Sequence, residues 1–253
     1  MKKKYYKIIT VVAAVVAVLC VAAGIYQYQK EKNAGSEYDK VREEVKKEPS
    51  VTPEAEKDPV DIPIDFSALQ KQNSDVYAWI KIENTNIDYP ILQKEGDNGY
   101  YLTHTMENKE SPEGSIFTED YNSTDFEDPN TVIYGHDMKN GSMFQNLLEY
   151  QDKEFFDHNR EVLIYTPDAI RHYKIFAAYL YDDRHLMESF DFNIKSIYQA
   201  YLDSIFSIRN MNAQIDTTAE IGTDDKVITL STCYGNQSDK RYLVQAVLVS
   251  IEK

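Results

Sequence analysis

The sequence predicts a mainly β protein of the α+β class, a closed eight-stranded β-barrel with one N-terminal transmembrane helix. Two observations carry this prediction. About eight short β-rich runs follow one another between residues 65 and 253, and closing them into a barrel leaves no exposed strand edges. An uncharged run over residues 8–26 precedes them. The chain has 253 residues, which is enough to bury a core without disulfides or metals.

The first 26 residues predict a membrane anchor. Four lysines within residues 1–7 precede the uncharged run over residues 8–26. At about 1.5 Å per residue this run spans roughly 28 Å, close to the hydrocarbon thickness of a bilayer. The basic flank predicts a cytoplasmic tail over residues 1–7 and an extracellular folded domain on a single-pass protein of the cell membrane. A cleaved signal peptide has the same charge order, with small residues at 22–24, but the length of the run favours a retained anchor.

Residues 27–64 predict a stalk. Residues 37–48 are dense in charge and predict a short solvated helix, and four prolines between residues 49 and 63 then interrupt regular structure. We therefore expect an extended linker that holds the folded part away from the membrane. The composition changes to strand-forming residues from residue 65, so the folded domain is predicted over residues 65–253.

The elements of this domain follow in order. A short amphipathic helix is expected over residues 66–72. Alternating apolar residues predict the first strands on either side of the turn residues 84–86, and Pro167 and Asp168 predict a hairpin between two later strands. The expected strands cover residues 78–82, 87–92, 115–117, 131–134, 162–165, 172–180, 226–232 and 242–251.

Two helices are expected between these strands. Residues 142–149 follow a glycine and place apolar side chains on one side. Residues 194–208 carry apolar residues at i, i+3, i+4, i+7, i+8, i+11 and i+14, which is typical of a helix packed along one face. Asn193 is its expected N-cap. The polar face is not basic enough for a lipid surface, so we expect a long helix inserted before the last two strands.

The composition argues against several classes of function. The chain has 42 acidic and 27 basic residues, a net charge of −15, whereas nucleic-acid binding depends on basic contacts to phosphates. Two cysteines exclude a disulfide framework. No two histidines have metal-ligand spacing, and the acidic residues between 119 and 128 are expected to form a solvated loop rather than a calcium site. We therefore expect no metal and no cofactor.

One cysteine lies outside the anchor and is the candidate nucleophile. Cys233 ends the β-rich run, and a polar loop over residues 234–239 follows it. The junction of a strand and a loop presents a reactive group on a rigid support. Arg241 opens the next strand, so a hairpin brings both side chains to one end of the barrel. An inert, buried thiol is the alternative.

A thiolate nucleophile needs a proton partner. His136 ends a predicted strand beside Gly135, a position like that of Cys233, whereas His172 lies inside a predicted strand. The position favours His136 without excluding the others. The remaining histidines lie among polar residues with no partner pattern: His104, His158 and His185.

Three motifs carry a resemblance to a known family. Residues 229–233 (TLSTC) followed by Arg241 resemble the TLxTC…R signature of sortases. Residues 133–144 (IYGHDMKNGSMF) resemble the histidine segment of class B sortases, and residues 79–90 resemble the early strands of that class. The helix expected at residues 194–208 resembles the helix that these enzymes insert before the cysteine-bearing strand. The resemblance covers about residues 65–251.

The resemblance implies a sortase-type barrel with short N-terminal helices and the activity of a membrane-anchored cysteine transpeptidase. Cys233 would attack a Thr carbonyl in the C-terminal sorting signal of a secreted protein and form a thioacyl intermediate. An amine from a peptidoglycan cross-bridge or its lipid-linked precursor would then resolve it. His136 would move the protons between the amines, and Arg241 would hold the carbonyl and offset its developing charge.

The resemblance also implies residues that touch the sorting signal, and these are Asn98, Leu102, Tyr134, Ser231 and Thr232. Three other functions stay open. A pilin lysine as the amine would make the chain a pilus polymerase, and water as the acceptor would make it a cysteine hydrolase. A surface-binding module without catalysis is the third.

Overall fold

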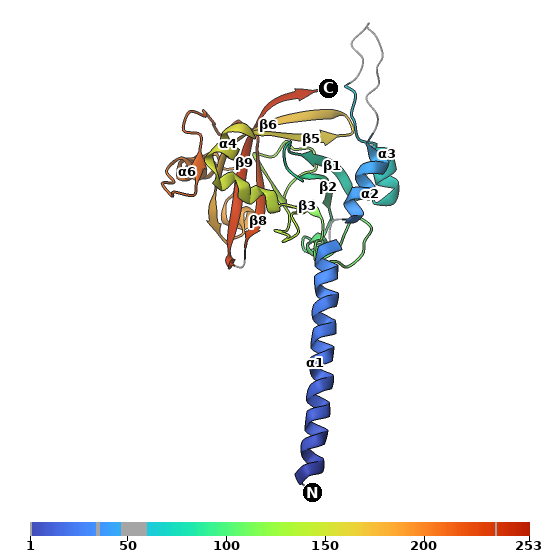
Figure 1. Cartoon of the computed structure of the whole chain (residues 1–253). Coiled ribbons are helices and arrows are strands. Elements are labelled where there is room, and N and C mark those ends of the chain that lie inside the picture. Colours follow the sequence, from blue (N-terminus) through green and yellow to red (C-terminus); the bar gives the residue numbers. More distant parts are fainter. Residues whose placement is uncertain (1, 34–35, 47–59, 236) are drawn as a thin grey trace.

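The computed structural model describes residues 2–33, 36–46, 60–235 and 237–253, and in them a closed barrel forms the body of the protein (Figure 1). Its strands are β1 (Val76–Lys81), β2 (Asp88–Gln93), β3 (Ile116–Thr118), β4 (Asn130–Tyr134), β5 (Glu161–Thr166), β6 (Ala169–Asp182), β7 (Gln214–Ile215), β8 (Val227–Tyr234) and β9 (Gln237–Glu252). The order is β5-β1-β2-β3-β4-β8-β9-β6, and β6 pairs with β5 to close the barrel. The short β7 joins β6. The predicted closed eight-stranded barrel is confirmed.

The pairing of the strands explains how distant residues meet. β4 and β8 run parallel, with Tyr134 opposite Ser231, and β8 and β9 run antiparallel, with Cys233 opposite Arg241. The side chains of β8 from Val227 to Thr232 are buried. Both faces of β8 are covered, because Ile228 and Leu230 join the inner core and Val227 joins a second core outside the barrel. Three of the six buried residues of β8 are hydroxyl residues, Thr229, Ser231 and Thr232. A strand held on both faces gives Cys233 a rigid support.

Helices cover the outside of the barrel, with α2 and α3 beside β1 and β2 and α6 on the opposite flank (Figure 1). The predicted helix over residues 66–72 is confirmed, and it starts where the Asp65 side chain accepts from the Ala68 amide at 3.0 Å. The helices are α1 (Lys2–Asn33), α2 (Ser36–Val45), α3 (Phe66–Gln72), α4 (Lys153–His158), α5 (Leu186–Ser189), α6 (Lys195–Phe206) and the 3₁₀ helices η1 (Tyr100–Leu102) and η2 (Gln145–Gln151).

Two expectations about helices are wrong in detail. The helix expected over residues 142–149 is instead the 3₁₀ helix η2, because Met143 has a left-handed backbone (φ 56°) that interrupts an α-helix there. Asn193 does not cap α6. Its own amide donates to Asp191 at 3.1 Å, and Ile194 occupies the cap position without a side-chain hydrogen bond.

α6 packs on the outside of the barrel, as its spacing predicts. Tyr198, Tyr201, Leu202 and Ile205 are buried, and they form the second core with residues of β6, β8 and β9. At roughly 1.5–3 kcal/mol for each fully buried large apolar side chain, this face fixes α6 firmly. The helix therefore closes the outer surface of the strands that carry Cys233 and Arg241.

α2 differs from the solvated helix expected within the stalk. Tyr38, Val41 and Val45 are buried, at 0 to 3% exposure, and belong to the barrel's own core. Lys46 pairs with Ile64 in an isolated β-bridge. The folded unit therefore includes α2. The first three of the four prolines expected to interrupt the stalk fall within residues 47–59, which lie outside the described residues.

α1 extends away from the barrel (Figure 1). Its segment Val11–Lys30 is apolar and long enough to cross a membrane by length and composition. This is one candidate span within the described part of the chain, in line with the anchor predicted from residues 8–26.

Candidate active site

Cys233 and Arg241 meet at the open end of the barrel. They are opposite one another in the β8–β9 ladder, and both side chains are half-buried. The Arg241 Nη1 donates to the Lys240 carbonyl at 2.9 Å. The hairpin that the sequence predicts between these residues is confirmed, but the loop expected over residues 234–239 is too long. β8 continues to Tyr234 and β9 already begins at Gln237, so Arg241 lies inside the strand. Gly235 starts the turn with a left-handed backbone (φ 54°).

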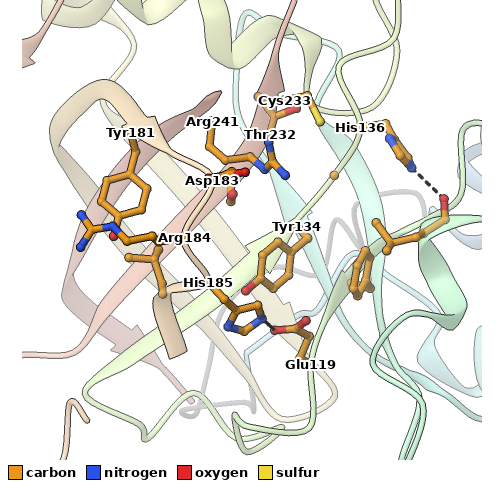
Figure 2. A pocket seen from close by; sticks show the side chains of 15 residues that line it. Glu119, Tyr134, His136, Tyr181, Asp183, Arg184, His185, Thr232, Cys233 and Arg241 are labelled. Carbon is orange, nitrogen blue, oxygen red and sulfur yellow. Dashed lines mark hydrogen bonds and ion pairs between the residues drawn. The ribbon is translucent and has the colours of Figure 1, made fainter. Parts of the chain in front are cut away.

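His136 reaches the same place from β4. The Gly135 amide donates to the Ser231 carbonyl at 3.1 Å, which extends the β4–β8 pairing by one residue. The next residue therefore lies beside the end of β8, and Figure 2 shows Cys233 and His136 on the same rim of the cavity. The His136 Nε2 lies 2.7 Å from the Leu102 carbonyl. A carbonyl oxygen only accepts, so Nε2 carries the hydrogen in this contact.

A cavity of about 220 Å³ opens beside these three residues. The lining comes from η1, from the ends of β3, β4 and β8, from the first part of β9, and from the end of β6 with the segment that follows it (Figure 2). The lining residues are Leu102, Phe117, Glu119, Tyr134, Gly135, His136, Tyr181, Asp183, Arg184, His185, Leu186, Ser231, Thr232, Cys233 and Arg241.

Four of the five predicted signal-binding residues line this cavity: Leu102, Tyr134, Ser231 and Thr232. Asn98 is not among the lining residues. Its side-chain oxygen accepts from the Asp120 amide at 2.8 Å, which ties two loops together. The role of all five in binding a substrate stays a prediction.

Glu119 and His185 form a half-buried pair at the far end of the cavity that sequence reasoning missed. The His185 Nε2 lies 2.7 Å from the Glu119 carboxylate, whose side chain is 14% exposed. The His185 Nδ1 accepts from the Glu188 amide at 3.3 Å, so Nε2 holds the hydrogen and the ring is neutral in this arrangement. Glu119 is thus not in a solvated loop, and His185 has a partner. The two residues are far apart in sequence, and no local pattern predicts their contact.

The phenol of Tyr134 lies beside this pair. Burial, followed by the nearby Glu119 carboxylate, raises the pKa of Tyr134 far above its ordinary value, so the phenol stays protonated at neutral pH. Its ring stacks on Phe117 with centroids 5.4 Å apart. The cavity floor is therefore aromatic with one half-buried carboxylate, and the thiol and the guanidinium lie at its opposite end (Figure 2).

Asp137 ties the histidine loop to the turn after Cys233. Its carboxylate accepts from the Gly235 amide at 3.0 Å, and burial raises the pKa of Asp137 above its ordinary value.

We expect Asp137→Ala to lower kcat by about tenfold or more, because it releases the turn that positions Cys233. Asp137→Asn keeps an oxygen acceptor and is the matched control in steady-state assays. Equal loss in both variants would contradict a positioning role.

Gly135 leaves no room for a side chain. A Cβ there would lie 2.5 Å from Ile116 Cδ1 and 2.7 Å from two ring carbons of Phe144. We expect Gly135→Ala to lower both the melting temperature and kcat, because the chain leading to His136 must shift. Thermal denaturation and turnover check this, with Gly222→Ala as control, since the nearest atom to a Cβ there is Asp225 Oδ2 at 3.9 Å. A Gly135→Ala enzyme with parental stability and rate would show that the loop yields freely.

Among the described residues no cluster of three or more His, Cys, Asp or Glu is arranged to hold a metal ion. The chemistry that the cavity offers is that of its own side chains. These are a thiol, an imidazole and a guanidinium at one end, a pattern suited to nucleophilic acyl transfer.

Comparisons with known proteins agree with this geometry. The family model described as a sortase domain matches residues 80–249. Sortase B of Listeria monocytogenes is 35% identical over 190 residues, covering 72% of this chain and 73% of the relative. Sortase B of Staphylococcus aureus is 25% identical over 256 residues, covering 98% of each.

Solved structures give the same assignment. Sortase B of Bacillus anthracis in complex with AAEK1 superimposes with a TM-score of 0.70 at 27% identity, covering 89% of this chain and 99% of that one. Sortase B of Clostridium perfringens gives 0.64 at 28% identity, covering 74% and 100%. The family-model match over residues 80–249 includes α6 and the strands that lead to the cysteine, the histidine and the arginine. The chain therefore belongs to the sortase family, in its class B branch, and is a sortase transpeptidase, as the resemblance predicts.

Proposed function

We propose that this sortase cleaves a C-terminal sorting signal of secreted proteins at a Thr carbonyl and transfers the protein to a peptidoglycan cross-bridge amine. The observation that carries the proposal is the meeting of Cys233, His136 and Arg241 at one end of a single cavity. A solved Staphylococcus aureus sortase B is described as a substrate complex, which supports a substrate in the corresponding cavity.

The chemistry proceeds in two steps. His136 takes the proton of the Cys233 thiol, and the thiolate attacks the Thr carbonyl carbon. The C–N bond of the signal then breaks, and the leaving amine takes this proton from His136. The incoming amine then attacks the thioester carbon, gives a proton to His136, and the C–S bond breaks to release the thiolate. Because Leu102 holds the Nε2 hydrogen, Nδ1 is the nitrogen that exchanges the proton.

Arg241 is proposed to bind the carbonyl oxygen as it gains negative charge. Its Cα partner in the ladder is Cys233, so the spacing between the nucleophile and the cation is set by the backbone. A guanidinium presents several donors in a fixed plane, which suits an oxyanion at a fixed position.

The compartment is part of the proposal. Residues 1–7 are assigned to the cytoplasm, residues 8–26 of α1 to the membrane and the barrel to the outer side, because the lysines precede the apolar segment. Secreted proteins and cell-wall precursors are then on the same side as the cavity.

Mass spectrometry of the full chain in detergent micelles tests the function. The chain is mixed with a panel of sorting-signal peptides, with and without a glycine-based amine. We expect an acyl adduct on Cys233 that the amine converts to an amide product. An adduct that yields only free acid, with or without the amine, would overturn transfer in favour of hydrolysis. A product formed with a pilin lysine peptide and not with the glycine amine would replace the cell-wall acceptor by a pilin.

A further inference from the structure

α2 reaches the loop that holds His136. We call residues 99–115 the Leu102 loop. It contains η1 and the Leu102 carbonyl, which lies 2.7 Å from the His136 Nε2. Figure 2 draws this contact as a dashed line from His136. Whatever fixes the Leu102 carbonyl therefore also fixes the orientation of the His136 ring.

Tyr38 of α2 binds the end of this loop. Its side chain is fully buried, and its hydroxyl donates to the Gly114 carbonyl at 2.7 Å. The Tyr38 hydroxyl oxygen also lies 2.9 Å from Ser115 Oγ. The single hydroxyl hydrogen of Ser115 can be donated either to this oxygen or to the His104 carbonyl, which is also 2.9 Å away. The Tyr38 hydroxyl thus binds the end of the Leu102 loop at Gly114 and contacts Ser115, which also reaches His104.

The end of the loop is in direct contact with Leu102. The Ser115 amide donates to the Tyr101 carbonyl at 2.9 Å. Gly114 has a left-handed backbone (φ 53°), and a Cβ there would lie 2.4 Å from the Tyr101 carbonyl oxygen and 2.7 Å from that of Leu102. Two backbone segments this close move together, because close-packed atoms transmit displacement.

A second contact joins α2 to the middle of the loop. The Glu37 carboxylate accepts from the Glu107 amide at 3.3 Å and lies 3.9 Å from the Lys109 ammonium. On the other side, the Tyr38 ring meets Tyr89 edge to face, with centroids 5.4 Å apart. α2 is therefore fixed to the barrel and holds the loop from two neighbouring residues.

We propose that Tyr38 is a positioning residue for His136, acting through Gly114, Ser115 and the Leu102 carbonyl. This rests on the proposed role of His136 in proton transfer. The hydroxyl fixes the end of the Leu102 loop, the loop fixes the Leu102 carbonyl, and the carbonyl selects the ring orientation and the Nε2–H tautomer. α2, the helix that follows the membrane span, therefore helps to position an active-site residue.

Tyr38→Phe removes the hydroxyl and keeps the buried ring. We expect kcat to fall about fivefold to tenfold, the scale of one lost hydrogen bond, with KM within about twofold. The full chain in detergent micelles is assayed with a sorting-signal peptide. Tyr198→Phe is the matched control, since Tyr198 as a whole is also 0% exposed and its hydroxyl donates to the Pro129 carbonyl at 3.0 Å on the outer side of the barrel. It should keep the parental kcat.

A spectroscopic measurement separates positioning from stability. Nitrogen-15 spectra of histidine-labelled protein report the tautomer of each of the five rings. We expect the His136 ring signals to move in Tyr38→Phe and to stay in Tyr198→Phe. Unchanged His136 signals in Tyr38→Phe, or the same change in both variants, would overturn the proposal.

Two further variants keep the test decisive. If Tyr38→Phe does not fold, Ser115→Ala removes the next hydroxyl in the same connection and must move the His136 signals in the same way. His136→Ala tests the proposed function on its own. A nearly parental rate of His136→Ala would exclude a role of His136 in the reaction. The His136 ring signals of Tyr38→Phe would still show whether Tyr38 positions the ring.

Discussion

Replacing Cys233 with alanine removes turnover and leaves the barrel folded. We expect the rate to fall by about 10⁴-fold or more, the scale seen when a covalent nucleophile is lost. Cys233 is half-buried at the end of β8, after six buried residues that already fix the strand. The loss of one sulfur there removes little packing. Product formation and circular dichroism of the full chain measure both effects.

The chain offers its own control for this experiment. Cys20 is the other cysteine and lies in α1, exposed on the helix surface. Cys20→Ala is expected to keep the parental rate and to leave one thiol for acylation. Turnover by Cys233→Ala within about tenfold of the parent would remove the covalent mechanism.

Arg241→Lys loses most activity although it keeps the charge. We expect kcat to fall by about 10²- to 10³-fold, the scale of one lost oxyanion donor. A lysine ammonium is a flexible point charge and does not reproduce the planar donor set of a guanidinium. Steady-state kinetics with a sorting-signal peptide measure the loss.

Arg209→Lys makes the same chemical change away from the cavity. Arg209 follows α6 and donates to the Phe206 carbonyl at 2.8 Å on the exposed surface, so its replacement is expected to leave kcat unchanged. Near-parental kcat in Arg241→Lys, with a lowered melting temperature, would assign Arg241 a structural role instead.

The barrel was predictable because each of its eight strands has a β-rich pattern in its own local sequence. Each expected β-rich run overlaps an observed strand, and the Cys233–Arg241 pairing follows from a hairpin between neighbouring strands. His136 was harder to place. It belongs beside Cys233 because β4 pairs in parallel with β8, and such a pairing across a long stretch of chain has no local signal. The family resemblance supplied it.

The sequence of α2 contains a pattern typical of a buried helix face, but its high charge favoured the interpretation as a solvated helix. Tyr38, Val41 and Val45 have the i, i+3, i+7 spacing of a buried helix face, but the surrounding charge suggested a solvated stalk. The charges lie on the other face. Glu119 and His185 lack even that signal, because a single side-chain contact depends on how two segments distant in sequence fold against each other.

The short junction between α1 and α2 limits the distance between the cavity and the membrane. Residues 34–35 alone separate the two helices, and α2 is fixed to the barrel by buried side chains. With residues 8–26 in a membrane, as proposed, the nine residues 27–35 lie between the span and α2, each adding at most about 3.6 Å. The cavity then stays within a short distance of the lipid surface. Donors and acceptors held at that surface meet it at high effective concentration, so membrane attachment of the substrate itself becomes a determinant of its rate of transfer.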